Sequence, residues 1–72
     1  MQENVDRQYK VARNIMNARR ARVMTIENLA EKTEIDIEFL KSIERIDPPL
    51  IPDDILKKIA KTLGVTLSDL LK

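Results

Sequence analysis

Residues 24–45 read MTIENLAEKTEIDIEFLKSIER, two short amphipathic segments joined by a few residues. Thr25 is a favourable N-cap for a helix over residues 26–32, and Asp36 is a favourable N-cap for a helix over residues 37–45. Each segment carries aliphatic side chains at helical spacing, which gives it one inner side. The pattern therefore predicts two short helices separated by a turn of three residues.

The rest of the chain predicts three further helices. They cover residues 4–21, 53–63 and 67–71. Gly64 stands where the end of a helix needs a left-handed residue, and Thr66 is the expected N-cap of the last helix. Three prolines between the third and fourth helices predict an irregular loop. No segment alternates with a period of two, so the sequence predicts an all-α protein, with residues 1–72 as one compact five-helix domain.

The composition excludes several classes of function. The chain has 72 residues with no Cys, no His and one Gly. Without His or Cys it lacks the usual general base, the nucleophilic thiol and the commonest metal ligands, so neither an enzyme nor a metal or cofactor site is expected. No apolar run approaches the ~20 residues of a membrane span and no secretory leader is visible, so a cytoplasmic protein is expected.

The net charge of +1 conceals an uneven distribution. Residues 1–22 carry six basic against two acidic side chains, and residues 57–72 carry four basic against one acidic. Residues 23–56 carry nine acidic against three basic side chains. Charge asymmetry of this kind bears on binding partners rather than on the fold. The acidic part of the chain includes both helices of the 24–45 stretch.

The two short helices and their supporting helices resemble the phage-repressor/Cro type of helix-turn-helix domain. The resemblance covers residues 13–71 and is strongest in residues 59–71, IAKTLGVTLSDLL. It implies a compact lambda-repressor-like domain of five helices that binds operator DNA, usually as a dimer, through its third helix. It also implies a structural ion pair between Arg19 in the first helix and Glu44 at the end of the third.

The residues that match the DNA-reading positions of this family are unusual. They are Ile37, Glu38, Phe39 and Ser42. Isoleucine and phenylalanine have no polar group for a base edge. Glu34, Asp36 and Glu38 would bring carboxylates toward a duplex that carries one phosphate charge per ~1.7 Å of its axis. These departures predict that the surface offered to DNA in the family is here a protein-binding surface.

Phe39 is the expected centre of that surface. Leu40 and Ile43 fill the inner positions of the third helix, so Phe39 is expected to lie largely outside; in the alternative, a slightly rotated helix, it belongs to the core. An exposed aromatic ringed by charges is a typical interface anchor. The predicted protein-binding set is Ile26, Glu34, Asp36, Ile37, Glu38, Phe39, Lys41 and Ser42, with Ile46 and Leu50 as further apolar candidates.

Two functions follow from these patterns. In the first, the chain is an antirepressor of a lysis–lysogeny switch, a monomer that docks on the DNA-binding domain of a helix-turn-helix repressor and contacts DNA weakly or indirectly. The chain is similar in size and pattern to the modulator-of-repression proteins of lactococcal phages. The alternative is a Cro-like, sequence-specific DNA-binding repressor, with contacts from Thr25, Lys41, Ser42 and Arg45. The basic first and fourth helices are either solvated surfaces or weak phosphate contacts.

Overall fold

The computed structural model describes residues 2–45 and 47–72, with side chains described from residue 7 onward. This part of the chain forms five helices and no strand. They are α1 (Gln2–Ala21), α2 (Ile26–Thr33), α3 (Ile37–Ile43), α4 (Asp53–Leu63) and α5 (Leu67–Leu71). The five-helix, all-α fold is as predicted. Two helix bounds differ by two residues: α1 begins at Gln2 and not at residue 4, and α3 ends at Ile43 and not at residue 45. Helix α3 ends there because the backbone N–H groups of Glu44 and Arg45 donate to carbonyls three residues earlier.

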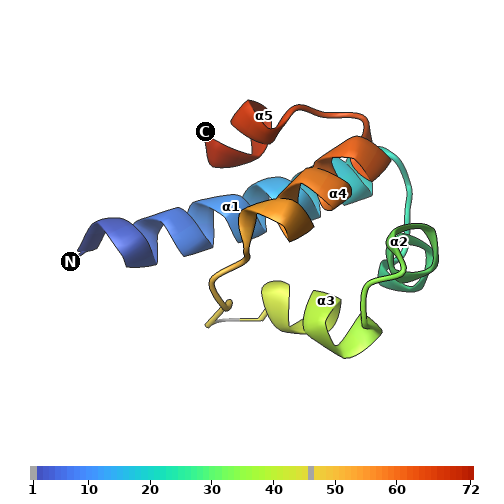
Figure 1. The fold of residues 1–72 in the computed structure, drawn as a ribbon, viewed down its shortest axis with the longest axis horizontal. Helices are drawn as coiled ribbons and strands as arrows, with labels where there is room; N and C mark the ends of the chain where they lie inside the picture. Colours follow the sequence, from blue (N-terminus) through green and yellow to red (C-terminus); the bar gives the residue numbers. More distant parts are fainter. Residues whose placement is uncertain (1, 46) are drawn as a thin grey trace.

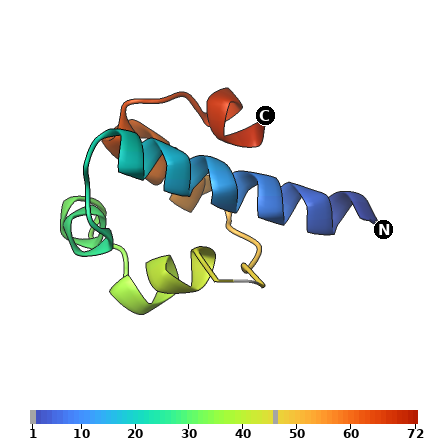
Figure 2. The same ribbon diagram turned by 180° about the vertical axis from the view of Figure 1, so that it is seen from behind.

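Helix α4 has the most neighbours: it contacts α1, α2 and α5, while α3 packs chiefly on α2. In Figure 1, α4 lies along α1, α5 covers one side of this pair, and α2 and α3 lie on the other side. The view from behind in Figure 2 shows α1 crossing the molecule, with α5 above it and α3 below it. The α2–α3 unit is thereby presented on one side of a scaffold made by the other three helices.

All five helices contribute to one core. Among the described side chains, seven large ones are less than 2% exposed: Ile15, Leu29, Ile43, Leu56, Ile59, Leu63 and Leu70. Each lies on the inner side of its helix, at the spacing that the sequence pattern predicts. Because these residues pack together in one core, their packing determines how α3 is held against α1 and α4.

Side chains cap the short helices as expected. The Thr25 Oγ1 accepts from the Asn28 N–H at 3.0 Å, and the Asp36 Oδ1 accepts from the Glu38 N–H at 3.0 Å. Ahead of α5, Thr66 forms the equivalent bond with the Asp69 N–H, also at 3.0 Å. An N-cap of this kind contributes about 1 kcal/mol. Such caps matter in helices of five to eight residues, which are too short to be stable alone.

Three of the described residues adopt the left-handed backbone conformation. Gly64 ends α4 with φ +74°, as predicted. Glu34 ends α2 with φ +60°, and Val23 lies between α1 and α2 with φ +52°. The left-handed region is costly for residues with a Cβ and especially for a β-branched valine.

The described residues contain neither a membrane-spanning helix nor a cluster of metal-binding side chains. No helix there is long and apolar enough to cross a membrane. In that same part of the chain, no group of three or more acidic side chains is placed to hold a metal ion.

Candidate functional site

The turn between α2 and α3 is fixed by hydrogen bonds within the pair. The buried Thr33 hydroxyl donates to the Leu29 carbonyl at 2.7 Å and accepts from the Ile35 N–H at 3.3 Å. The Glu34 N–H donates to the Ala30 carbonyl at 2.8 Å, which closes α2 and turns the chain. In Figure 1, α2 is seen end-on beside α3, which lies across the view. This is a helix-turn-helix arrangement.

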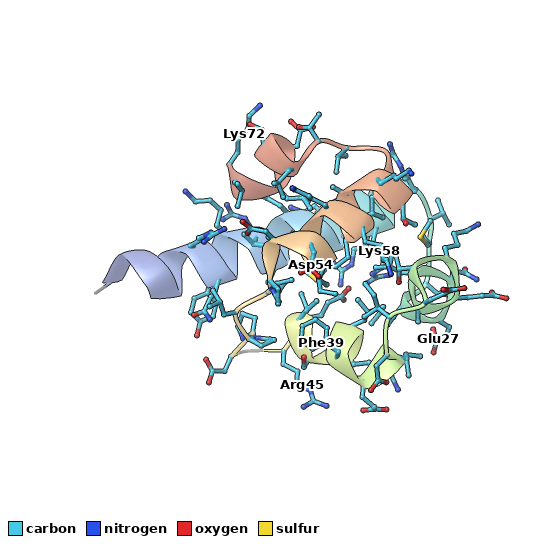
Figure 3. The ribbon with its side chains drawn as sticks, in the orientation of Figure 1. Glu27, Phe39, Arg45, Asp54, Lys58 and Lys72 are labelled. Atoms are coloured by element: carbon cyan, nitrogen blue, oxygen red, sulfur yellow. The ribbon has the colours of Figure 1, made fainter. Side chains whose placement is uncertain are left out.

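One side of α3 and of the residues just after it faces solvent. We call it the outward side of α3 and define it by Glu38, Lys41 and Arg45, all exposed. Leu40 and Ile43 are buried on the opposite side. The Lys41 Nζ lies 3.8 Å from the Glu38 Oε2, an exposed pair that contributes at most about 1 kcal/mol. Arg45 points away from the body of the protein (Figure 3) and no ion pair engages it within the described residues.

Two hydroxyl groups of the predicted DNA-contact set are already partly used. Ser42 Oγ donates to the Phe39 carbonyl at 2.5 Å, so its oxygen remains available only as an acceptor. Thr25 Oγ1 accepts the capping bond from Asn28, so its own proton remains available for donation. A base amino group suits Ser42, whereas a phosphate oxygen suits Thr25.

Arg19 and Glu44 form the expected ion pair, which supports α3 from behind. The Nε and Nη2 atoms of Arg19 donate to the two carboxylate oxygens of Glu44 at 2.7 and 2.8 Å. Both side chains are largely buried. The hydrogen bonds to Glu44 raise the pKa of Arg19, against the opposing effect of its burial. Arg19 is therefore committed to α3 and is not free for a phosphate.

Comparison with known families identifies this arrangement. Residues 13–72, which include all of α2 to α5, match the model of the Cro/C1-type HTH DNA-binding domain. The chain belongs to this family. The Cro/C1-type domain is a non-enzymatic family, which agrees with the exclusion of catalysis from the composition. No curated protein and no solved structure matches the chain.

Phe39 is placed differently in this Cro/C1-type domain than its sequence position suggested. It is half-buried and packs against the core, so the expectation of an exposed aromatic was wrong. The reason is helical geometry: at about 100° per residue, Phe39 lies about 40° from Ile43, on the edge of the inner side. The expectation of exposure considered only the angle between Phe39 and Leu40 and left out the nearby Ile43.

The other members of the predicted apolar surface do not gather around Phe39. Ile26 packs against the core, and Ile37 is half-buried. Leu50 is 62% exposed but lies in a hollow beside Arg7 of α1. Ile46 lies outside the described residues. The described residues therefore do not show the expected apolar surface around Phe39, because Ile26 and Phe39 pack on the core and Leu50 lines a different hollow.

Phe39 instead lines an open groove between α3 and α4. We call it the α3–α4 groove; its volume is about 350 Å³ and its lining residues are Glu34, Ile35, Asp36, Phe39, Pro52, Ile55 and Lys58. Of the predicted protein-binding set, the groove unites Glu34, Asp36 and Phe39. The contribution of α4 was missed. The one sequence feature that could have indicated it is the position of Ile55 at the edge of the inner side of α4.

Basic side chains of α1 extend to the end of α3. Lys10, Arg13 and Arg20 are exposed on α1, about 100° or less from one another around the helix. Arg13 and Arg45 line the same hollow of about 170 Å³, with Tyr9 beside them. The outward side of α3 thus continues into a basic part of α1. Helix α4 carries a separate set of exposed lysines, which does not belong to this basic part of α1: Lys57, Lys58 and Lys61.

Proposed function

We propose that the chain is a transcriptional regulator that binds DNA through the outward side of α3. The single observation that carries the proposal is the solvent-facing pair Lys41 and Arg45 on a Cro/C1-type helix-turn-helix, held in place by the Arg19–Glu44 pair behind it. Two cations on this side attract phosphates, and neighbouring hydroxyls supply shorter-range contacts.

Each polar group on this side has a definite part in the proposed complex. Lys41 and Arg45 neutralise phosphates, and Thr25 donates its hydroxyl proton to a phosphate oxygen. Ser42 accepts from a base amino group, and Glu38 accepts from cytosine N4. Because Glu34 and Asp36 stand close to the same end of α3, affinity is expected to be modest and strongly dependent on salt.

Selection from a pool of random duplexes tests the proposal. The full chain is mixed with the pool at low salt, bound duplexes are recovered over several rounds, and the enriched sequence is examined by footprinting. The proposal predicts an enriched sequence that is protected in the footprint. A pool that remains random after selection would contradict sequence-specific binding.

A second candidate function is the antirepressor, acting in the cytoplasm of a bacterial host cell as one chain per partner. It is favoured by a different observation, the three carboxylates of Glu34, Asp36 and Glu38 around the first turn of α3. In the described ion pairs, only Lys41 comes within 4 Å of one of them, at 3.8 Å from Glu38. Carboxylates at this position repel phosphates and attract a basic surface, such as the DNA-reading side of a repressor.

Glu38→Gln distinguishes the two functions, because it removes one charge from the outward side of α3 and leaves the Asp36 cap in place. If the chain binds DNA, the variant binds a selected duplex more tightly, because the glutamine oxygen still accepts from cytosine N4 while the charge that repels phosphates is gone. If the chain is an antirepressor, the variant forms a weaker complex with the DNA-binding domain of a repressor encoded beside it. Glu31→Gln, an exposed carboxylate of α2 away from α3, is the matched control.

A further inference from the structure

The α3–α4 groove is a second surface, separate from the outward side of α3. At about 100° per residue, Phe39 lies about 160° from Lys41 around α3. In Figure 3, Phe39 is seen between α3 and α4, whereas Arg45 points away below α3. A duplex on the outward side of α3 therefore leaves the groove open, and DNA binding does not account for it.

The chemistry of the groove is apolar in the middle and charged at its edges. Ile35, Phe39 and Ile55 are half-buried, so each packs on the core and still presents part of its surface to the groove. Pro52 forms part of one wall of the groove. It is the N-cap residue of α4 but makes no side-chain capping hydrogen bond. An aromatic ring that is already held by its core contacts loses little conformational freedom when a ligand covers it, which is typical of interface anchors.

The charged edges indicate what kind of ligand fits. Glu34 and Asp36 lie at the end formed by the α2–α3 turn, and Lys58 is the one cation that lines the groove. Asp54, one helical turn before Lys58, is seen beside it on α4 in Figure 3. None of these four charges is in an ion pair among the described residues. Three carboxylates against one ammonium favour a ligand with basic side chains around an apolar one.

We propose that the α3–α4 groove binds a short basic segment of another protein, which inserts one large apolar side chain beside Phe39 and places a Lys or Arg against Glu34 and Asp36. The segment occupies the groove while the outward side of α3 remains free. The inference goes beyond the proposed DNA-binding function, since a bound segment leaves the outward side of α3 open to DNA.

The probe is a fluorescein-labelled helical peptide of about four turns, with Leu at every third or fourth position and Lys elsewhere. Its partner in the comparison is the same peptide with Glu in place of Lys. Affinity for the full chain is measured by fluorescence anisotropy, and NMR amide shifts of the labelled chain locate the site. We expect binding of the Leu/Lys peptide, with the largest shifts in residues 34–39 and 52–58.

Two variants test the anchor and the charge separately. Phe39→Ala is expected to lower the affinity for the Leu/Lys peptide about 30-fold, which is typical of the loss of one interface anchor. Glu34→Asn is expected to weaken it about threefold, a typical exposed charge pair, and asparagine tolerates the left-handed backbone at this position. Circular dichroism checks that each variant is folded; if Phe39→Ala is unfolded, Glu34→Asn still decides.

Two matched controls separate the groove from general attraction to an acidic surface. Glu31→Gln and Glu27→Gln each remove one exposed carboxylate of α2 away from the groove and are expected to leave peptide binding unchanged. The proposal is overturned if the Leu/Glu peptide binds as tightly as the Leu/Lys peptide. It is equally overturned if Glu34→Asn binds like the unaltered chain, or if either control weakens binding as much as Glu34→Asn does.

Discussion

Arg19 holds Glu44 through two nearly parallel hydrogen bonds, of 2.7 and 2.8 Å, and so ties the end of α1 to the end of α3. The remaining Nη1 group donates to the Met24 carbonyl at 2.6 Å, in the link that leads to α2. One guanidinium therefore fixes three parts of the chain relative to one another. Because both side chains are largely buried, the pair orients the helix-turn-helix as well as stabilising it.

Arg19→Ala and Glu44→Ala are each expected to lower the free energy of unfolding by about 3 kcal/mol, since either change strands a largely buried charge. Arg19→Lys is also expected to destabilise, because an ammonium cannot form the paired bonds of a guanidinium. Urea unfolding followed by circular dichroism measures the change. The double variant is expected to lose much less than the sum of the two single losses; strict additivity would mean that the pair is not coupled.

The pH dependence of the Arg19 contribution to stability is set by the direction of the Arg19 pKa shift. The pKa of Arg19 is raised in the folded protein, chiefly by its hydrogen bonds to Glu44. A raised pKa gives stability that is complete below the pKa of the unfolded chain and is lost only as the pH rises through the folded value. The contribution of Arg19 is therefore expected to be constant throughout the neutral range.

Val23→Gly is expected to stabilise the protein. Val23 has φ +52° and is 90% exposed, so glycine removes backbone strain and forfeits almost no burial. The strain of about 1–2 kcal/mol exceeds the extra unfolded-state entropy of glycine, which leaves a gain of about 0.5–1 kcal/mol. Thermal unfolding checks it, and a lower midpoint for the variant would show that Val23 makes a contact that outweighs the strain.

Gly64→Ala is the reverse experiment. At Gly64, φ is +74° and a Cβ would lie 2.7 Å from the Arg22 Nη2. The flexible Arg22 side chain can move aside, so the expected loss of about 1 kcal/mol comes mainly from the backbone. Adding Arg22→Ala to this variant relieves the contact and is expected to restore little stability. Full recovery in the double variant would instead assign the loss to the contact.

Asp69 is expected to titrate below the ordinary range of an aspartate. Its pKa is lowered first by the hydrogen bond from the Thr66 backbone N–H, at 3.1 Å, and then by the Thr66 side chain and Lys72. A lowered pKa gives stability that is present above the unfolded pKa and is lost as the pH falls through the folded one. The first turn of α5 is therefore expected to open in acid.

NMR titration of the Asp69 carboxyl carbon measures this pKa directly. The same carbon in the urea-unfolded chain is the reference, and its midpoint is expected to lie higher than in the folded chain. Asp69→Asn is expected to remove this part of the acid dependence of α5. Equal midpoints in the two states would contradict the capping role of the carboxylate.

The sequence predicted those features that depend on residues close together in the chain. Thr25, Asp36 and Thr66 act on N–H groups two or three residues away, and Gly64 acts on its own backbone. These contacts define the helix boundaries, so five helices were predictable. The left-handed Val23 was not, because valine is among the least suited residues for that conformation.

The candidate site was less predictable, since it depends on contacts between helices distant in sequence. Phe39 is half-buried because Ile43 and the neighbouring core fix how far α3 is rotated. The groove arises where α3 meets Pro52 and Ile55 after a proline-rich loop. The Arg19–Glu44 pair is the exception: it spans 25 residues of sequence and was expected only because the chain resembles a known family.

The most direct test of the DNA-binding account is the salt dependence of duplex binding, measured by fluorescence anisotropy with a selected duplex. Lys41→Ala and Arg45→Ala are compared with Lys57→Ala, an exposed lysine of α4 about 160° around that helix from the Ile55 edge. The account predicts that the affinity of the unaltered chain falls steeply with salt. The slope of log K against log salt is expected to become shallower by about one in Lys41→Ala and in Arg45→Ala, and to stay unchanged in Lys57→Ala. Equal slopes for all four proteins would contradict it.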